Sequence, residues 1–201
     1  MTIPTPSNIE VDKYLDLWDA LDNYVAQESS LRKLFTKTYP RNESMDDILI
    51  KVCSLNDFYS TNIFDPFRVA KHILDLKIDE KLEKIDIEIV NQIAKVKMNG
   101  DKIKNVYSFA TKYCSHHKPQ EYPIYDSYVE KILIHFKNDF CRFHKDELKQ
   151  YTRYKDILLE FRRYYKLEKY DLKQIDKYLW QAGKEYFPRK YKKANSMPAF
   201  E

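Results

Sequence analysis

The chain contains only two glycines, Gly100 and Gly183, among its 201 residues. Tight β-turns rely on glycine for backbone angles that other residues avoid, so this scarcity argues against an all-β fold. It also leaves no glycine-rich phosphate loop, neither the P-loop nor the dinucleotide-binding fingerprint. The chain is therefore expected to be helical.

Apolar residues recur every three or four positions along almost the whole chain, which is typical of amphipathic helices. Cap residues and prolines mark where the helices begin, most clearly at Asp65-Pro66 and at Asp126. We expect an all-α fold of about ten short helices, in one globule or in two lobes that share a cleft. The helices are predicted over residues 8–25, 31–35, 45–55, 67–74, 102–116, 127–136, 151–166 and 171–185, with short ones starting at Asp79 and Asp86.

Composition bounds the class of protein further. Hydrophobic residues make up 43% of the chain, enough for a core, yet no apolar run approaches the roughly 20 residues of a membrane-spanning helix. The first residues do not form a secretory signal, and three scattered cysteines do not form a disulfide framework. We expect a cytoplasmic protein with one helical domain, residues 1–187, and a basic tail, residues 188–201.

Positive charge is concentrated in the last third of the chain. Between residues 139 and 193 there are 16 Lys and Arg against 9 Asp and Glu. Such a balance suits a polyanionic partner, and it is equally typical of a solvated helix face. Arg162 and Lys166, four residues apart, are predicted to share a helix face that meets DNA. The aromatic and basic residues 189–193 suit phosphate contact or a frayed terminus.

The segment from residue 108 to residue 129 carries the clearest chemistry. Lys112 lies among apolar neighbours in the middle of a predicted helix. Residues 121–125 must be extended, because a residue before proline avoids the helical region. Asp126 then stands at the N-cap of the next helix. Folded back on itself, this segment would place the ammonium and the carboxylate at one wall of a cleft.

This segment resembles the helix-hairpin-helix DNA glycosylase superfamily, and within it the 8-oxoguanine glycosylases. That branch carries a Thr-Lys pair on one helix and a proline-hydrophobic-x-Asp motif that opens the next. Thr111-Lys112 and Pro123-Ile124-Tyr125-Asp126 match both motifs. Residues 48–56 and 175–184 are also similar to helices of that fold, so that the resemblance extends over residues 45–184.

The resemblance implies a DNA-repair enzyme that excises an oxidised purine from duplex DNA without a metal or an organic cofactor. Lys112 would attack C1′ of the sugar as an amine, giving a Schiff base and an associated abasic-site lyase activity. Asp126 would stabilise positive charge at C1′ or take the proton from the lysine. The amine must be neutral, so its pKa would be lowered by burial or by a cation such as Lys118, His116 or His117.

Base excision also requires the base to leave the stack, which costs a few kcal/mol. Asn56 is the candidate wedge residue that enters the stack, and aromatic side chains would stack on the displaced base. The residues expected to contact DNA are Asn56, Tyr59, Tyr107, Ser108, His116, His117, Lys118, Arg162 and Lys166.

Two features depart from the family. Residues 105–109, just before the lysine, contain no glycine, whereas family members grip phosphate there with the backbone amides of a glycine-rich hairpin. Asp126 also follows Lys112 after only 14 residues, a shorter interval than in the family. Two alternatives therefore remain: a non-catalytic member of the fold that binds nucleic acid or a protein, and an unrelated helical interaction module.

The candidate residues also have ordinary structural roles. Lys112 is open to being a surface lysine whose stem crosses the core. Asp126 is a helix cap in any case, worth about 1 kcal/mol. Asn56 is open to being a polar residue at a helix end.

The cysteines offer a further alternative. The pairs Cys114-x-x-His117 and Cys141-x-x-His144 have the spacing of a Cys2His2 zinc site but no knuckle glycine. No sharp-turn motif surrounds a cysteine, as a thiol nucleophile would require. Buried thiols and exposed imidazoles are the expectation at these positions.

Overall fold

Helices make up most of the structure, which confirms the all-α prediction. The structure is a computed structural model that describes residues 2–98, 100 and 102–188. Within these residues the α-helices are α1 (Asn8–Asp19), α2 (Asp22–Lys33), α3 (Met45–Tyr59), α4 (Pro66–Leu76), α5 (Asp79–Glu83), α6 (Ile89–Ala94), α7 (Tyr107–His117), α8 (Ser127–Phe140), α9 (Tyr151–Tyr164) and α10 (Leu172–Tyr186). A π-helical turn (Leu34–Thr38) extends α2, and a 3-10 helix (Lys145–Lys149) precedes α9.

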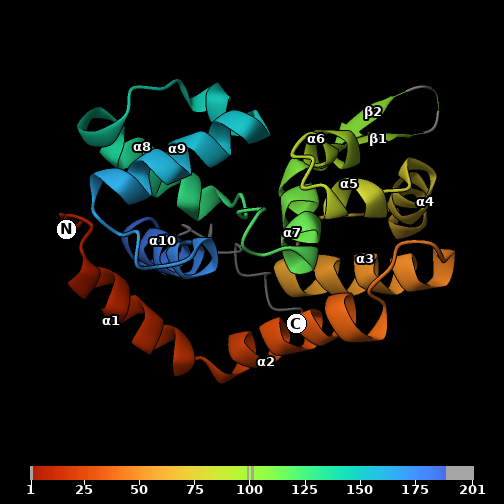
Figure 1. The fold of residues 1–201 in the computed structure, drawn as a ribbon, viewed down its shortest axis with the longest axis horizontal. Coiled ribbons are helices and arrows are strands. Elements are labelled where there is room, and N and C mark those ends of the chain that lie inside the picture. Colours follow the sequence, from red (N-terminus) through yellow and green to blue (C-terminus); the bar gives the residue numbers. More distant parts are fainter. Residues whose placement is uncertain (1, 99, 101, 189–201) are drawn as a thin grey trace, which may run out of the picture.

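The helices form two groups that share one hydrophobic core (Figure 1). In the first group α10 packs against both α1 and α8, with α9 against α8. In the second group α3 packs against α4 and α6 packs against α7, while α2 contacts both α3 and α7. The chain passes between the groups twice, between α1 and α2 and again along residues 118–126.

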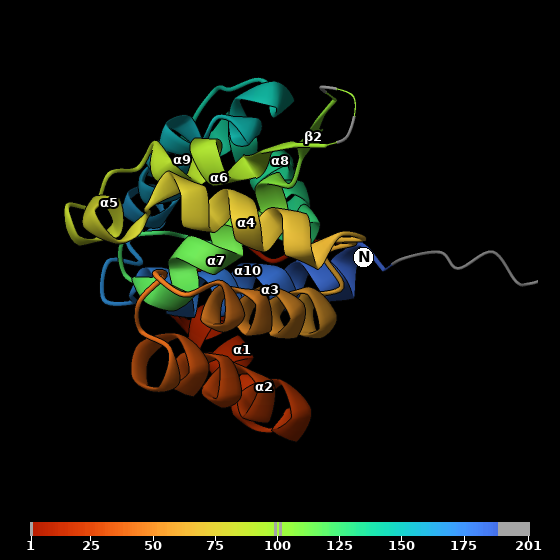
Figure 2. The same ribbon diagram turned by 90° about the vertical axis from the view of Figure 1, so that its right-hand side faces the viewer.

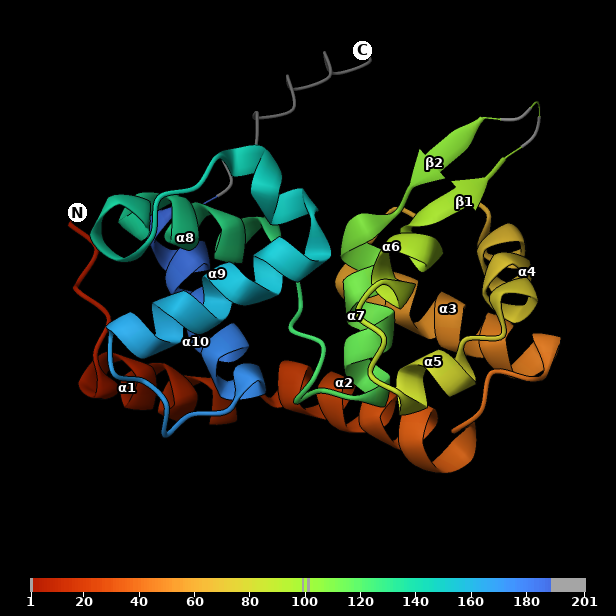
Figure 3. The same cartoon turned by 45° about the horizontal axis from the view of Figure 1, so that its top comes forward.

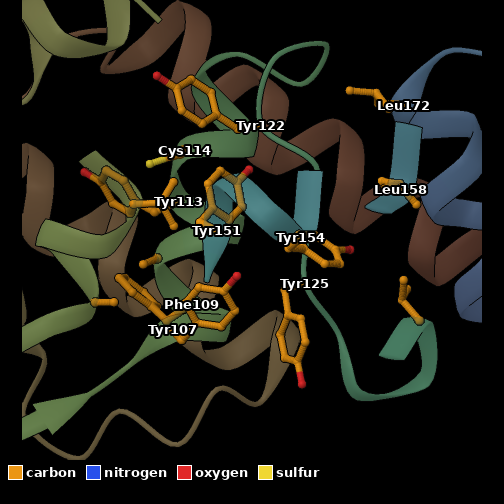
Figure 4. Packing of buried hydrophobic residues seen from close by; sticks show 14 of the residues in the cluster. Tyr107, Phe109, Tyr113, Cys114, Tyr122, Tyr125, Tyr151, Tyr154, Leu158 and Leu172 are labelled. Carbon is orange, nitrogen blue, oxygen red and sulfur yellow. The ribbon is translucent and has the colours of Figure 1, made fainter. Parts of the chain in front are cut away.

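Tyrosines pack around the second of these connections (Figure 4). The ring centroids of Tyr125 and Tyr154 are 5.6 Å apart. The hydroxyl of Tyr154 donates to the Ile124 carbonyl at 2.5 Å, and that of Tyr151 donates to the Pro123 carbonyl at 2.9 Å. Because no strand of the described residues pairs with this extended stretch, the phenol groups supply the donors that its buried carbonyls need.

Four helix starts follow the cap signals of the sequence. The side chains of Ser7, Asp65, Asp126 and Asp171 each accept a backbone N–H from the first turn of the helix that follows. Pro66 occupies the first turn of α4, where its missing N–H costs nothing.

A short antiparallel ribbon replaces predicted helix. Strand β1 (Lys95–Lys97) pairs with β2 (Ile103–Asn105), with Val96 opposite Lys104. The sequence predicted a helix that reached Val96 and another that began at residue 102. Strands of three residues are too short to show alternation, and the connection contains Gly100 with a φ of +68°.

The N-terminal helices begin and end at different residues than predicted. The single helix predicted over residues 8–25 is interrupted at Ala20 and Leu21, where the chain turns from α1 into α2. Residues 31–35, predicted as a separate short helix, belong to the end of α2 and to the π-helical turn. The basic residues 189–193 lie outside the described residues. Among the helices described, none combines the length and apolar character needed to cross a membrane.

Gly183 lies where α10 crosses α8. A Cβ at this position would be 2.6 Å from the Tyr128 carbonyl oxygen and 2.7 Å from the Tyr128 Cβ. We expect Gly183→Ala to force the helices apart and to lower the free energy of unfolding by about 1–3 kcal/mol in urea titrations. The exposed neighbour provides a control, since Lys184→Ala should change that free energy by less than about 0.5 kcal/mol. Equal effects of the two substitutions would contradict this close approach.

Candidate functional site

A cavity of about 300 Å³ lies between the two groups of helices. Its walls come from α1, α2, the end of α3, α7, the connection before α8, and α10. The charged side chains that line it deeply are Glu28, Lys112, Asp126, Lys173, Asp176 and Lys177. Two of these, Lys112 and Asp126, are the residues that the sequence motif predicted to share a cleft.

Lys112 is held at the cavity wall from the middle of α7. Its side chain is only 3% exposed. The ammonium donates to Ser108 Oγ at 2.7 Å and to the Tyr125 carbonyl at 3.2 Å. It also lies 5.3 Å from the ring centroid of Tyr59, which lines the same cavity. Lys112 is therefore a buried site residue and does not extend to the protein surface.

The two carboxylate oxygens of Asp126 have different partners. Oδ1 accepts the backbone N–H of Tyr128 at 2.9 Å and so caps α8. Oδ2 lies 3.6 Å from Nζ of Lys112. Capping a helix and facing the lysine are thus compatible, because the cap occupies one oxygen only.

Helix α7 also fixes the backbone that precedes Asp126. The Tyr125 N–H donates to Thr111 Oγ1 at 3.1 Å, and Ser108 Oγ donates to the Tyr125 carbonyl at 3.2 Å. These contacts come from the turns of α7 around Lys112. The Thr-Lys pair is therefore a structural unit in which the threonine positions the connection and the lysine faces the cavity.

Burial governs the protonation of Lys112. Removal from water lowers the pKa of Lys112 below its ordinary value, and the carboxylates of Asp126 and Asp176 act in the opposite direction. The positive charge of Lys173, another lining residue, lowers the pKa of Lys112 further. Geometry and electrostatics therefore favour an amine that loses its proton more readily than an exposed lysine.

The histidines do not supply the predicted cation. Burial lowers the pKa of His117 to about 3 and that of His116 well below its usual range, so both rings are neutral at pH 7. His116 Nε2 is paired with the Tyr59 hydroxyl at 3.1 Å, and His117 Nε2 with Asn42 Nδ2 at 3.2 Å. Lys118 is exposed at the end of α7 and does not line the cavity.

Helix α10 contributes a set of charges that the sequence analysis missed. Lys173 lies 3.7 Å from Asp176 and 3.6 Å from Glu28, and Glu28 also pairs with Lys177 at 2.8 Å. Burial raises the pKa of Asp176 to about 6, although Lys173 and Lys112 oppose the rise. Lys173, Asp176 and Lys177 are three and four positions apart, so the sequence places them on one helix face. A charged helix face usually lies in solvent, so this spacing did not indicate a buried site.

Aromatic rings form the outer part of the cavity. The centroids of Trp18 and Trp180 are 5.9 Å apart, and those of Tyr24 and Trp180 are 5.2 Å apart. Trp18 Nε1 and Asp176 Oδ1 are buried and have no hydrogen-bond partner among the described residues. Unpaired buried polar atoms are rare in proteins, and both of these belong to residues that line the cavity.

Three predicted DNA contacts have internal roles instead. Tyr107 is buried, and its hydroxyl donates to the Leu148 carbonyl at 3.2 Å. Asn56 Oδ1 accepts the N–H of Ile63 at 2.9 Å, and Asn56 Nδ2 donates to the carbonyl of the same residue at 3.1 Å. Asn56 therefore holds the α3–α4 loop and does not project as a wedge. Ser108 orients Lys112, as described above.

The predicted basic face of α9 does not form. Arg162 donates to the Glu168 carbonyl at 3.0 Å and so closes the turn that follows the helix. Lys166 lies beyond the end of α9, with a φ of +55°, so the two residues do not share a helix face. Neither residue lines the cavity.

The cysteine pairs do not assemble into a metal site. Within the described part of the chain, no three His, Cys, Asp or Glu side chains gather in a way that would hold a metal ion. Cys114 is fully buried in α7, and burial raises its pKa well above the ordinary thiol value. A thiolate at this position is therefore strongly disfavoured.

Fold and site together define an all-α protein in which a buried lysine and a partly exposed aspartate face a cavity between two groups of helices. Residues 10–121 match the HI_0787_N family, described as an N-terminal domain. The chain belongs to this family, and Lys112 lies inside the matched range. An uncharacterized protein of Haemophilus influenzae (strain ATCC 51907 / DSM 11121 / KW20 / Rd) is 45% identical over 148 residues, which cover 72% of this chain and 70% of that protein. No solved structure matches the chain.

The double role of Asp126 predicts that two substitutions will separate the cap from the charge. Asp126→Ala removes both and should lower the free energy of unfolding by about 1 kcal/mol. Asp126→Ser keeps an oxygen that can cap α8 but has no carboxylate. Urea titration should therefore show that this variant regains most of the free energy of unfolding that Asp126→Ala loses. If the serine variant is as unstable as the alanine variant, the carboxylate and not the cap supports the fold.

The raised pKa of Asp176 predicts a pH-dependent stability. A carboxyl group whose pKa is higher in the folded state than in the unfolded state stabilises the fold at low pH and loses that contribution as pH rises through about 6. Urea titrations from pH 4 to pH 7 should show the wild type losing stability relative to Asp176→Asn. The exposed Asp16→Asn serves as the control and should leave the wild-type slope unchanged. Parallel pH profiles for wild type and Asp176→Asn would contradict a buried, protonated Asp176.

Proposed function

We propose that this protein is a DNA N-glycosylase that excises an oxidised purine, with Lys112 as nucleophile and Asp126 as its carboxylate partner. The observation that carries this proposal is the placement of a buried amine 3.6 Å from a carboxylate at the wall of a cavity with aromatic walls. The motif around these two residues resembles that of the 8-oxoguanine glycosylases, and their geometry suits the chemistry such enzymes perform.

The reaction follows from the properties of the pair. Positive charge develops at C1′ of the sugar as the glycosidic bond breaks, and the Asp126 carboxylate would stabilise it. The lone pair of the neutral Lys112 amine forms a bond to C1′, while the base leaves with the pair of the broken bond. The new ammonium gives up a proton to Asp126, and that proton is available to the departing base. The nitrogen lone pair then forms the C=N bond as the C1′–O4′ bond breaks, and the second N–H proton goes to O4′, which gives a Schiff base between C1′ and Lys112.

The cavity supports a base-sized substrate. Its volume is near the lower end of the roughly 300–1,000 Å³ typical of small-ligand sites, which suits one flat ring system. Stacking on Trp180 or Tyr24 would offset part of the cost of taking a base out of the duplex.

Borohydride trapping tests the proposed chemistry. The wild type, incubated with duplex DNA that contains 8-oxoguanine or an abasic site, should give a covalent adduct on reduction. Lys112→Gln should reduce the adduct at least 100-fold, since the nucleophile is lost. Lys84→Gln removes an exposed lysine that pairs with Glu80 far from the cavity, and it should leave the yield unchanged.

The outcomes separate the alternatives. Retention of the adduct in folded Lys112→Gln, verified by thermal unfolding, would reject Lys112 as nucleophile. Absence of any adduct together with salt-sensitive binding to DNA would favour a non-catalytic member of the fold. The lack of glycine in residues 105–109 supports the same alternative. Absence of binding at low salt would reject a DNA-directed function altogether.

A further inference from the structure

The β1–β2 ribbon stands out from the body of the protein just before α7 (Figure 3). Its segment, residues 95–105, contains four lysines and one carboxylate. Lys95 and Lys97 are exposed on one strand, and Lys102 is exposed just before the other. These three ammonium groups have no carboxylate partner among the described residues. The ribbon therefore carries an excess of positive charge just before α7.

The α3–α4 loop lies beside the ribbon and holds a phenylalanine in solvent. Phe64 is 85% exposed, although the preceding Ile63 is buried. Three hydrogen bonds of Asn56 fix the loop: its Oδ1 accepts from Thr61 Oγ1 and from the Ile63 N–H, and its Nδ2 donates to the Ile63 carbonyl. Ser60, with a φ of +48°, ends α3 as its left-handed C-cap. Phe64 is thus exposed on a loop whose neighbouring residues are held by hydrogen bonds.

Lys104 connects this loop to the ribbon. Its ammonium donates to the Asn62 carbonyl at 3.2 Å and lies 4.8 Å from the centroid of the Phe64 ring. The loop in turn begins at the cavity, because Tyr59 and Ser60 both line it. Figure 2 shows the ribbon, the end of α3, the start of α4 and the end of α10 along one edge of the molecule. Positive charge and an exposed aromatic ring therefore lie side by side, next to the loop that begins at the cavity.

We propose that the ribbon and the α3–α4 loop form the duplex-DNA interface, in which the lysines contact phosphates and Phe64 enters the base stack. This inference rests on the proposed function only in taking DNA as the partner. Lysines that neutralise phosphates release counterions and so give affinity without backbone amides of glycine. Apolar wedges such as phenylalanine occupy the gap that a displaced base leaves, at a cost repaid by the contacts that follow.

The salt dependence of binding to an undamaged duplex tests the ribbon. Each phosphate contact adds about 0.9 to the slope of log K against log salt. The double variant Lys95→Gln/Lys97→Gln should reduce that slope by about 1–2, and Lys95→Arg/Lys97→Arg should restore it. Lys33→Gln/Lys37→Gln makes the same change of charge on exposed positions of α2 and the π-helical turn, and it should leave the slope unchanged. Equal slopes for the ribbon variant and this control would overturn the ribbon as a phosphate contact.

The fluorescence of 2-aminopurine placed next to an abasic site tests Phe64. Insertion of the ring unstacks the probe, so the wild type should raise its fluorescence on binding. Phe64→Ala should abolish most of that rise while changing the affinity for an intact duplex less than threefold. Tyr164→Ala removes another exposed aromatic ring, on α9, and should keep the full rise. A full rise with Phe64→Ala would overturn the wedge.

The salt-slope and fluorescence measurements test the interface separately from the reaction that the borohydride assay tests. If no adduct forms but the ribbon variant lowers the salt slope, the enzymatic proposal falls and the interface stands. If the wild type forms the adduct while ribbon and Phe64 variants match their controls, the interface falls and the enzymatic proposal stands. If the wild type does not bind DNA at low salt, both are wrong.

Discussion

The burial of the Lys112 ammonium is the interaction on which the arrangement of the molecule depends. An ammonium removed from water is costly unless acceptors surround it. Here the acceptors come from Ser108 in the same helix and from Tyr125 and Asp126 in the connection to α8. The connection must therefore return to α7, and this return sets one group of helices against the other and leaves the cavity between them.

The abundance of tyrosine follows from the same constraint. An extended connection that crosses the core without a neighbouring strand leaves its carbonyls unpaired, and a buried unpaired carbonyl is destabilising. Tyr151 and Tyr154 satisfy the carbonyls of Pro123 and Ile124 while their rings fill the space between the helices. A phenylalanine would fill the same space without supplying the donor, which gives the hydroxyl groups a structural reason apart from any ligand.

The parts of this protein that sequence reasoning recovers are the local ones. Caps such as Asp65 and Asp126 act within one turn of chain, so a short window contains all the information they need. The ribbon around Val96 was missed because its pairing is between strands too short to show a period. Arg162 and Lys166 were placed on one helix face because a helical pattern does not show where the last turn ends. Asn56 was left as a candidate wedge or a polar residue at a helix end, because nothing local shows that its amide closes a loop.

The sequence by itself determined the helical class and the main helix starts, because cap and proline signals are local, and its motif predicted that Lys112 and Asp126 share a cleft. Only the tertiary structure decided which charges surround that pair. Periodicity shows that Lys173 and Asp176 lie close together on one helix, but not that the face they occupy is buried. Protonation depends on that burial, because the cost of a charge is set by what replaces water around it. For this reason the neutral histidines and the raised pKa of Asp176 follow from packing between segments far apart in the chain.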